Sequence, residues 1–249
     1  MKLPVLAVDD NAVNLAVATG MLANLGLGSE TAADGVEAVQ AAMRRSYAAI
    51  LMDCMMPRMD GCHATRAIRG HEQRRSLPRV PIIGVSALAA AEDRVAALAA
   101  GMDSYVVKPL SLRALSDELQ RFGIAIQAKT ASSPAMPSSA TLDPAIVANL
   151  RALPGDLARQ LWLEFADGLP TRQAEIATAV AADDAASVQR LAHSLRGSAA
   201  TLGLAALAQG LLACEMALKR QDAAWRQAWD QVPVLATTAE AAARRAAEG

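Results

Sequence analysis

The chain has 249 residues, enough for two ordinary domains. Hydrophobic residues make up 53% of it but aromatic residues only 3%, and this composition favours helices that pack through small side chains. The net charge is −1, and neither the part before residue 123 nor the part after it has an excess of basic residues. The charge therefore excludes nucleic acid as an expected partner.

The cysteines and the apolar runs indicate where the chain resides. Cys54, Cys62 and Cys214 lack metal-ligand spacing, and so small and odd a set is typical of a reducing compartment. No apolar run approaches the roughly 18 residues of a membrane-spanning helix. Asp9 and Asp10 end the first apolar run too early for a signal peptide. We therefore expect a soluble, cytoplasmic chain that makes no membrane contact of its own.

Short apolar runs alternate with amphipathic stretches over residues 1–122. This alternation predicts an α/β fold, a doubly wound parallel sheet of five strands with helices on both faces. The expected strands are Val5–Val8, Ser29–Ala32, Ala48–Met52, Ile82–Val85 and Ser104–Val107. The expected helices are Val13–Leu25, Gly35–Arg44, Cys62–His71, Ala90–Ala100 and Leu112–Phe122.

Polar residues stand at the carboxyl ends of four of these strands. Asp9 and Asp10 follow the first strand, Asp53 the third, Ser86 the fourth and Lys108 the fifth. Each residue alone also suits a helix cap or a turn. Because the carboxyl ends of parallel strands share one edge of the sheet, we expect all five to lie together. Three carboxylates repel one another unless a cation lies among them, and hard oxygen ligands suit Mg²⁺.

Four motifs in this part follow one another with a spacing typical of one family. They are VDDN with Asp9 and Asp10, MDCMMPRMDG around Asp53, GVSA with Ser86, and YVVKP from Tyr105 to Pro109. Over nearly all of residues 4–122 the chain resembles the receiver domains of bacterial response regulators. The resemblance implies a flavodoxin-like fold, with Asp53 as the phosphate acceptor. It also implies a Mg²⁺ site made by Asp9, Asp10, Asp53 and the backbone carbonyl of Met55.

The same resemblance implies roles for the remaining residues of the motifs. Ser86 and Lys108 would contact the phosphoryl oxygens, and Tyr105 would be the aromatic switch residue whose rotamer follows phosphorylation. The Lys108–Pro109 peptide is expected to be cis. Ser86 replaces the more frequent Thr but keeps the hydroxyl group. A long basic connection, Glu72–Arg79, precedes the fourth strand, as in receivers attached to hybrid sensor kinases, and we expect a solvated loop there.

Residues 124–141 change in character. Ser, Ala and Pro dominate this stretch without periodicity, which predicts a flexible tether. The expected boundaries are therefore a receiver domain over residues 1–123, a linker over 124–141 and a second domain over 142–249. The hypothesis that follows is mobility of the two domains relative to each other.

The pattern from Leu142 onward is entirely helical. The expected helices are Ala145–Leu153, Asp156–Asp167, Thr171–Ala182, Ala185–Leu202, Leu204–Gln221 and Ala223–Ala247. The breaks between them fall at Pro154-Gly155, Gly168–Pro170, Asp183-Asp184, Gly203 and Asp222. Four long antiparallel helices with short connections, preceded by two shorter ones, predict a four-helix bundle. Pro233 should kink or split the last helix.

One helix of this bundle carries a histidine on its outer side. Its apolar residues fall within about 40° of one line on a helical wheel, and they are Val188, Leu191, Ala192, Leu195, Ala199 and Leu202. His193 lies roughly 140° from Val188, close to Gly197 and Ala200. Gly197 costs about 1 kcal/mol relative to alanine in a helix, so we expect a compensating function, such as room for a partner's loops.

A lone surface histidine is usually without function, but the residues around this one are distinctive. The string AHSLRGSAATLG resembles the phosphorylated-histidine helix of histidine-containing phosphotransfer (HPt) domains. The resemblance implies that His193 carries a phosphoryl group. It also implies that Arg196 and Gly197 support this group, since an arginine can hold phosphate oxygens with its fork of donors.

The two resemblances together imply a multistep phosphorelay. A kinase histidine would phosphorylate Asp53, and His193 would receive the group from Asp53 and donate it to a separate response regulator. No ATP-binding kinase region or P-loop occurs in the sequence. The chain is therefore expected to be either a free-standing relay protein or the cytoplasmic tail of a sensor kinase.

Two alternatives belong to other classes. In the first, the chain is a regulatory docking module whose fourth helix and fifth strand grip or release a kinase when Asp53 is phosphorylated. In the second, it is an aspartyl-phosphate hydrolase of the haloacid-dehalogenase type. Those enzymes need Asp-x-Asp after the first strand, which Asp9-Asp10-Asn11 does not supply.

Overall fold

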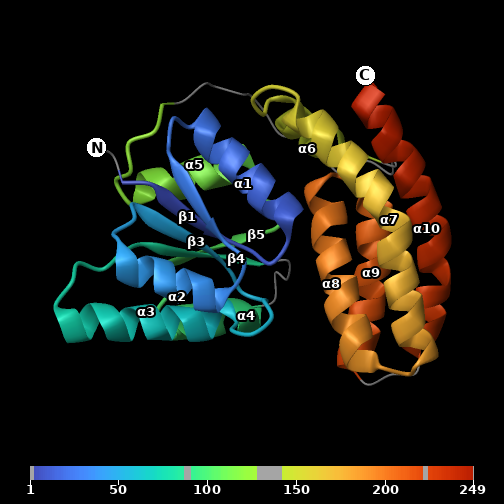
Figure 1. Cartoon of the computed structure of the whole chain (residues 1–249), viewed down its shortest axis with the longest axis horizontal. Helices are drawn as coiled ribbons and strands as arrows, with labels where there is room; N and C mark the ends of the chain where they lie inside the picture. Colours follow the sequence, from blue (N-terminus) through green and yellow to red (C-terminus); the bar gives the residue numbers. More distant parts are fainter. Residues whose placement is uncertain (1–2, 87–90, 128–141, 221–223, 249) are drawn as a thin grey trace. The chain divides into compact units, whose positions relative to one another are not determined.

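The computed structural model describes residues 3–86, 91–127, 142–220 and 224–248 (Figure 1). The chain divides into two compact units, Met1–Ala131 and Ser132–Gly249. Each unit has its own architecture and is built from the elements predicted for it, with the exceptions given below.

The first unit is a five-stranded sheet with helices on both faces. Its strands are β1 (Val5–Val8), β2 (Ser29–Ala32), β3 (Ala49–Asp53), β4 (Ile82–Ser86) and β5 (Ser104–Val107). All neighbours pair in parallel, and the order is β2-β1-β3-β4-β5. This is the flavodoxin-like order, so the predicted fold is confirmed. β1, β3 and β4 are buried throughout because both faces of the central sheet are covered.

Helices α1 and α5 lie on one face of the sheet, and α2, α3 and α4 on the other (Figure 1). The helices are α1 (Ala12–Asn24), α2 (Gly35–Arg44), α3 (Gly61–Arg75), α4 (Ala91–Ala99) and α5 (Leu112–Arg121). Four of the five are preceded by an N-cap residue whose side chain accepts a hydrogen bond from a backbone N–H of the first turn. These caps are Asn11 for α1, Asp34 for α2, Asp60 for α3 and Ser111 for α5.

The basic connection before β4 is more ordered than the predicted loop. Helix α3 continues to Arg75, four residues past its expected end, and stops at Ser76 in the left-handed conformation. The following backbone is held at Val80, whose N–H donates to Glu72 Oε1 at 2.8 Å and whose carbonyl accepts from Arg69 Nη1 at 2.9 Å. Residues 73–79 are exposed, whereas Glu72 is buried and the end of the connection is held against α3.

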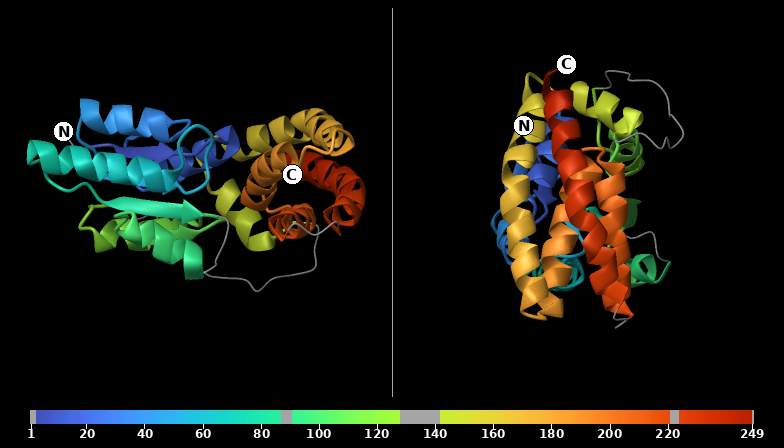
Figure 2. Two further views of the ribbon diagram at one scale, coloured as in Figure 1. Left: turned by 90° about the horizontal axis from the view of Figure 1, so that it is seen from below. Right: turned by 90° about the vertical axis from the view of Figure 1, so that its right-hand side faces the viewer.

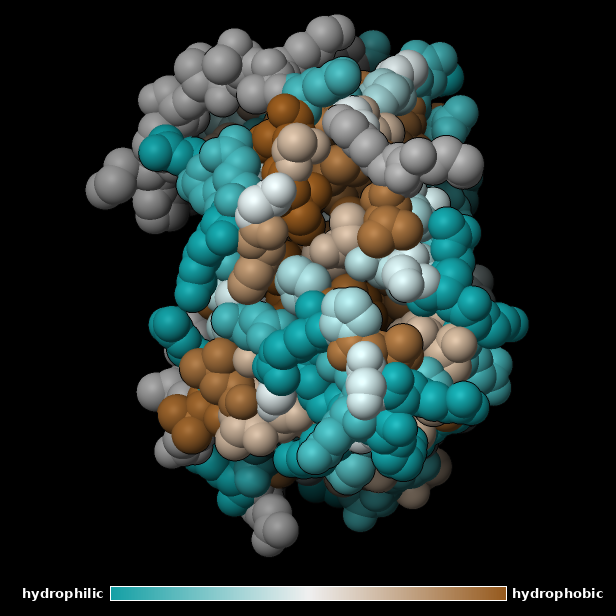
Figure 3. Space-filling view, turned by 90° about the vertical axis from the view of Figure 1, so that its left-hand side faces the viewer, coloured by the Kyte–Doolittle hydropathy of each residue, from teal (hydrophilic) through white to brown (hydrophobic). Residues whose placement is uncertain are grey.

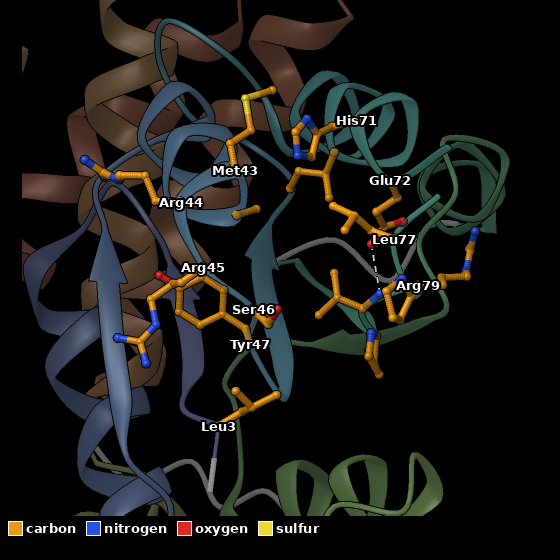
Figure 4. Close-up of a pocket in the computed structure, with 15 residues that line it drawn as sticks. Leu3, Met43, Arg44, Arg45, Ser46, Tyr47, His71, Glu72, Leu77 and Arg79 are labelled. Atoms are coloured by element: carbon orange, nitrogen blue, oxygen red, sulfur yellow. Dashed lines mark hydrogen bonds between the residues drawn. The ribbon is translucent and has the colours of Figure 1, made fainter. Parts of the chain in front are cut away.

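A cavity of about 410 Å³ lies beside this connection, where β3 and β4 begin and therefore opposite the strand ends that carry the predicted site. Met43, His71 and Leu77 face one another around it, whereas the guanidinium groups of Arg44 and Arg45 point away (Figure 4). Apolar side chains gather in patches bordered by hydrophilic ones on the face shown in Figure 3. None of the residues predicted for catalysis or metal binding lines this cavity.

The second unit is a bundle of four long helices preceded by a short one. Its elements are α6 (Pro144–Arg151), α7 (Leu157–Ala181), α8 (Ala185–Thr201), α9 (Ala205–Lys219) and α10 (Ala224–Glu248). The long helices pack in a closed ring, α7 on α8, α8 on α9, α9 on α10 and α10 on α7, and run side by side (Figure 2). The predicted four-helix bundle is confirmed.

The predicted break at Gly168–Pro170 is wrong. Residues 157–181 form one helix, α7, with Pro170 in its interior. Pro170 has no N–H to donate to the Ala166 carbonyl. Burial of Phe165, Ala166 and Leu169 on one face of the helix favours continuation over a break at this point. The last helix is likewise not split, since α10 runs through Pro233.

The predicted tether begins inside the first unit. Gln127 donates its N–H to the Leu25 carbonyl at 2.9 Å, and Ile124 donates to the Leu119 carbonyl at 3.0 Å. Residues 128–141 lie outside the described residues, so their flexibility stays a prediction. So does the expected break at Asp222, which is also undescribed. Within the described part of the chain, no helix joins sufficient length to the apolar composition that crossing a bilayer requires.

Candidate functional site

The parallel sheet brings the predicted strand-end residues to one edge. Asp9 comes directly after β1, Asp53 ends β3, Ser86 ends β4 and Lys108 comes directly after β5. Carboxylate oxygens of Asp9, Asp10 and Asp53 all lie within 4.8 Å of one another. We call Asp9, Asp10, Asp53 and Lys108 the acidic notch.

Lys108 joins two carboxylates of the acidic notch. Its Nζ lies 2.6 Å from Asp9 Oδ2 and 2.9 Å from Asp53 Oδ2, and all three side chains are buried. Asn14 further orients Asp9, because its Nδ2 donates to Asp9 Oδ1 at 3.0 Å. The positions of both carboxylates are therefore set by contacts from other elements.

Burial and charge shift the acid–base properties of this notch. Burial raises the pKa of Asp53 to about 6, and the neighbouring Asp9 charge adds to this effect while Lys108 opposes it. Burial alone would lower the pKa of Lys108, but the Asp53 and Asp9 carboxylates outweigh it and raise that pKa. Three carboxylates against one ammonium leave two negative charges among hard oxygen donors. This donor set fits a Mg²⁺ ion.

The loop after Asp53 packs tightly against the strand end. Met55 N–H lies 3.4 Å from Asp53 Oδ1, and Gly61 N–H donates to the Cys54 carbonyl at 3.2 Å. A Cβ at Gly61 would lie 2.1 Å from the Asp53 carbonyl oxygen, so only glycine allows α3 to begin there. The role of the Met55 carbonyl as a metal ligand stays a prediction.

Ser86 lies on β4, the strand next to β3, and Tyr105 lies on β5, the edge strand that pairs with β4. Ser86 is buried, and its carbonyl accepts from the Lys108 N–H at 2.7 Å, which places the hydroxyl-bearing residue beside the lysine. Tyr105 packs over Gly84, where a Cβ would lie 3.2 Å from its ring. The Lys108–Pro109 peptide is cis, as expected. The phosphoryl contacts of Ser86 and the switch role of Tyr105 stay predictions.

His193 lies on α8 and is less exposed than the helical wheel suggests. Its side chain is 14% exposed, because Glu215 of α9 lies against it, with Oε2 at 3.1 Å from His193 Nδ1. Arg196 Nη2 lies 3.1 Å from the same ring nitrogen. The nitrogen that remains for chemistry is Nε2.

Only one of these two contacts to Nδ1 is a hydrogen bond at a time. A ring nitrogen either carries a proton, which the carboxylate accepts, or a lone pair, which the guanidinium donates to. When Nδ1–H donates to Glu215, the lone pair is on Nε2, and the imidazole is ready to act as a nucleophile there. Glu215 therefore favours the tautomer with the lone pair on Nε2, whereas Arg196 favours the one with the lone pair on Nδ1.

Arg196 forms an ion pair within the bundle. Its Nε lies 2.5 Å from Glu215 Oε1 and its Nη2 3.3 Å from Oε2, and both side chains are buried. Burial alone would raise the pKa of Glu215, but hydrogen bonds from His193 and Arg196 outweigh it and lower that pKa. The structure thus ties Arg196 to Glu215, and its support of a phosphoryl group stays a prediction. So does the room that Gly197, one turn after His193, leaves for a partner.

Sequence reasoning missed Glu215. It lies 22 residues from His193, on the next helix, and its contact depends on how α8 and α9 are aligned across Gly203. One signal was present, because Glu215 interrupts the buried stripe of Leu211, Cys214 and Leu218. A carboxylate in such a stripe requires a partner.

Comparisons with known families now bear on both units. Residues 5–120 match the family model of the response regulator receiver domain, and residues 160–245 match that of the Hpt domain. The chain is a receiver–Hpt protein.

This receiver–Hpt protein is similar to hybrid sensor kinases. It is 30% identical over 240 residues to the sensor histidine kinase GacS of Pseudomonas protegens, covering 92% of this chain and 26% of that protein. It is also 30% identical over 210 residues to the signal transduction histidine-protein kinase BarA of Shigella flexneri, covering 82% and 22%. A probable histidine kinase 1 of rice is 36% identical over 149 residues, covering 49% and 15%. The chain spans about a quarter or less of the length of these relatives.

Two solved structures each match about half of the chain. The receiver domain of the sensor histidine kinase PA1611 of Pseudomonas aeruginosa, solved with a magnesium ion in its active site cleft, is 45% identical. The match covers 49% of this chain and 98% of that chain, with a TM-score of 0.45. The complex of the Saccharomyces cerevisiae phosphotransfer protein Ypd1 with the Ssk1 receiver domain matches with 29% identity, 49% and 89% coverage and a TM-score of 0.47.

Proposed function

We propose that this receiver–Hpt protein relays phosphoryl groups. Asp53 accepts a phosphoryl group from the histidine of an upstream sensor kinase, and His193 takes it from Asp53 and donates it to a downstream response regulator. The observation that supports this proposal is that one chain holds both kinds of site: an acidic notch around Asp53 and an imidazole in contact with Glu215. The cytoplasmic location stays a prediction.

The transfer from Asp53 to His193 balances without a further reactant. The Nε2 lone pair attacks phosphorus, an N–P bond forms, and the acyl phosphate O–P bond breaks to leave the Asp53 carboxylate. Phosphoryl transfer asks a protein mainly for positioning and charge neutralisation. Mg²⁺, held by Asp9, Asp10, Asp53 and the Met55 carbonyl, would supply positive charge at the notch. Lys108 and Ser86 then contact the phosphoryl oxygens, and Lys108 neutralises the carboxylate that is released.

Radiolabelled acetyl phosphate, applied to the full chain with Mg²⁺, tests this function. We expect an acid-stable, base-labile acyl phosphate on Asp53 and an acid-labile phosphoramidate on His193. Asp53→Asn should abolish both labels, whereas His193→Gln should abolish only the second. Asp117→Asn and His63→Gln, which change exposed residues of the same types, serve as matched controls and should retain both labels.

A second function is favoured by one specific observation. Val95 and Leu98 on α4 and Val107 on β5 are large apolar side chains that remain exposed, as a docking surface requires. A regulatory docking module would carry label on Asp53 that never reaches His193. If label stays on Asp53 even when a competent downstream receiver is present, the docking function is supported and the relay is not.

A further inference from the structure

The loop of residues 54–60 connects Asp53 at the end of β3 to Gly61 at the start of α3, includes Met55, and is attached at three places. Cys54 N–H donates to the Val85 carbonyl at 3.1 Å at its start, and Gly61 packs on Asp53 at its end. The third attachment is in the middle, where the Met59 carbonyl accepts from the Gly35 N–H at 3.2 Å. The loop is thus joined to the first turn of α2.

Arg58 adds a side-chain contact to this third attachment. Its guanidinium contacts the Asp34 carboxylate and lies 3.3 Å from Glu37 Oε1. Arg58 itself is 59% exposed, but Asp34 is only 1% exposed. An ion pair with one buried partner is screened less than one between two exposed partners.

The two acceptors are held in place independently of Arg58. Asp34 Oδ1 accepts from the Glu37 N–H at 2.9 Å, and Glu37 Oε2 accepts from the Ala33 N–H at 2.9 Å. Each carboxylate therefore keeps its other oxygen for Arg58. Both acceptors are contacted by one nitrogen of the planar guanidinium, Nη2, which carries two hydrogens in fixed directions.

The backbone at Arg58 has a conformation that is uncommon for an arginine. Its φ is +63°, in the left-handed region that favours glycine. An arginine here is strained unless its contacts compensate, and the pairs with Asp34 and Glu37 are the compensating contacts.

We infer that Arg58 is a positioning residue for the acidic notch: by latching the middle of the loop to α2, it holds the Met55 carbonyl in place for the metal. This inference rests on the proposed function, because only a receiver that binds Mg²⁺ uses that carbonyl. The ion pairs of Arg58 are with Asp34 and Glu37, which lie outside the acidic notch.

Mg²⁺ titration calorimetry on the full chain tests the inference. If Arg58 acted only through its charge, its removal would change the Mg²⁺ affinity in the opposite direction to that expected for a latch. Removing a positive charge near a dication should tighten binding. Removing a latch on a ligand-bearing loop should weaken it, by about tenfold for Arg58→Ala, as for other residues that orient metal ligands. Arg79→Ala is the matched control, since Arg79 is 56% exposed and pairs with Asp103. Its Mg²⁺ affinity should equal that of the wild type.

Hydrogen exchange without Mg²⁺ provides an independent measurement. The amides of Met55 and Met59 should exchange at least about tenfold faster in Arg58→Ala than in the wild type, and Arg58→Lys should fall between. Arg58→Gly relieves the backbone strain and removes the latch together, so it serves if Arg58→Ala fails to fold. Unchanged exchange, or unchanged or tighter Mg²⁺ binding, overturns the latch. A wild-type chain that binds no Mg²⁺ instead overturns the proposed function, and the exchange result still decides the latch.

Discussion

Lys108 is the residue on which the charge balance of the receiver unit depends. It is the cation that pairs with two buried carboxylates, Asp9 and Asp53. Burying like charges together is costly unless they are paired, so the lysine stabilises the notch before any metal binds.

Replacing Lys108 by methionine should therefore destabilise the metal-free receiver unit by about 3–5 kcal/mol, the usual cost of leaving a buried charge uncompensated. Saturating Mg²⁺ should restore most of this loss. Differential scanning calorimetry in EDTA and in Mg²⁺ measures both effects. Lys219→Met, at an exposed lysine of α9, should change neither transition. A Lys108→Met unit as stable as the wild type in EDTA would contradict this account.

Glu215 has the corresponding importance in the bundle, because its carboxylate lies against His193 Nδ1 and we expect it to favour the Nδ1–H tautomer. Glu215→Gln replaces an acceptor-only carboxylate by an amide that can donate or accept. The preference for the Nδ1–H tautomer should weaken, and transfer from Asp53 should slow. Ring-nitrogen NMR shifts of His193 report the tautomer, and exposed Glu164→Gln is the control. An unchanged tautomer ratio would remove Glu215 from the mechanism.

Among the secondary-structure elements, α7 forms against a local break signal in its sequence. Pro170 lies in the interior of α7, and its ring is exposed. Because proline has no backbone N–H, the helix lacks one hydrogen bond there. Pro170→Ala restores that bond and should stabilise the bundle by about 1–3 kcal/mol. Urea unfolding followed by tryptophan fluorescence measures this, because all three tryptophans lie in the bundle. No gain in stability would mean that the proline fits its site without cost.

The packing of α8 on α9 makes the bundle sensitive to acid. The pKa of Glu215 is lower in the folded state than its ordinary value of 4.5, so the unfolded state binds more protons in acid. The stabilisation is fully present above pH 4.5 and is lost as the pH falls through the folded-state pKa. Urea unfolding at a series of pH values should show a smaller loss in Glu215→Gln than in wild type. Equal slopes would contradict the contribution of Glu215.

For the whole molecule, the two sites lie on different compact units, and the flexible tether predicted between these units would leave His193 of one chain free to meet Asp53 of another. A mixture of the Asp53→Asn and His193→Gln chains should therefore place label on His193 of the first chain. The rate should rise with protein concentration. A mixture that stays unlabelled at His193, while the wild type is labelled, would mean that transfer occurs only within one chain.

Prediction from sequence worked best where a local pattern determines the structure. The parallel sheet followed from alternating apolar runs, and the gathering of Asp9, Asp53 and Lys108 followed from their positions at strand ends. It failed at Pro170, because a local rule for proline was outweighed by burial on one face of α7. It overlooked Arg58, because the αL backbone and the contact to Asp34 arise only when the loop meets α2.

The sequence by itself determined all five strands and, apart from the break predicted in α7, the order of the helices. It also determined which chemical groups stand at the sheet edge and on the helix of His193. These follow from periodicity and spacing, which are properties of neighbouring residues. Only the tertiary structure decided which charges pair: Lys108 between two aspartates, Arg58 with Asp34, and Glu215 with both Arg196 and His193. The physical reason is that pairing depends on the alignment of elements distant in sequence, and burial of their apolar faces sets that alignment.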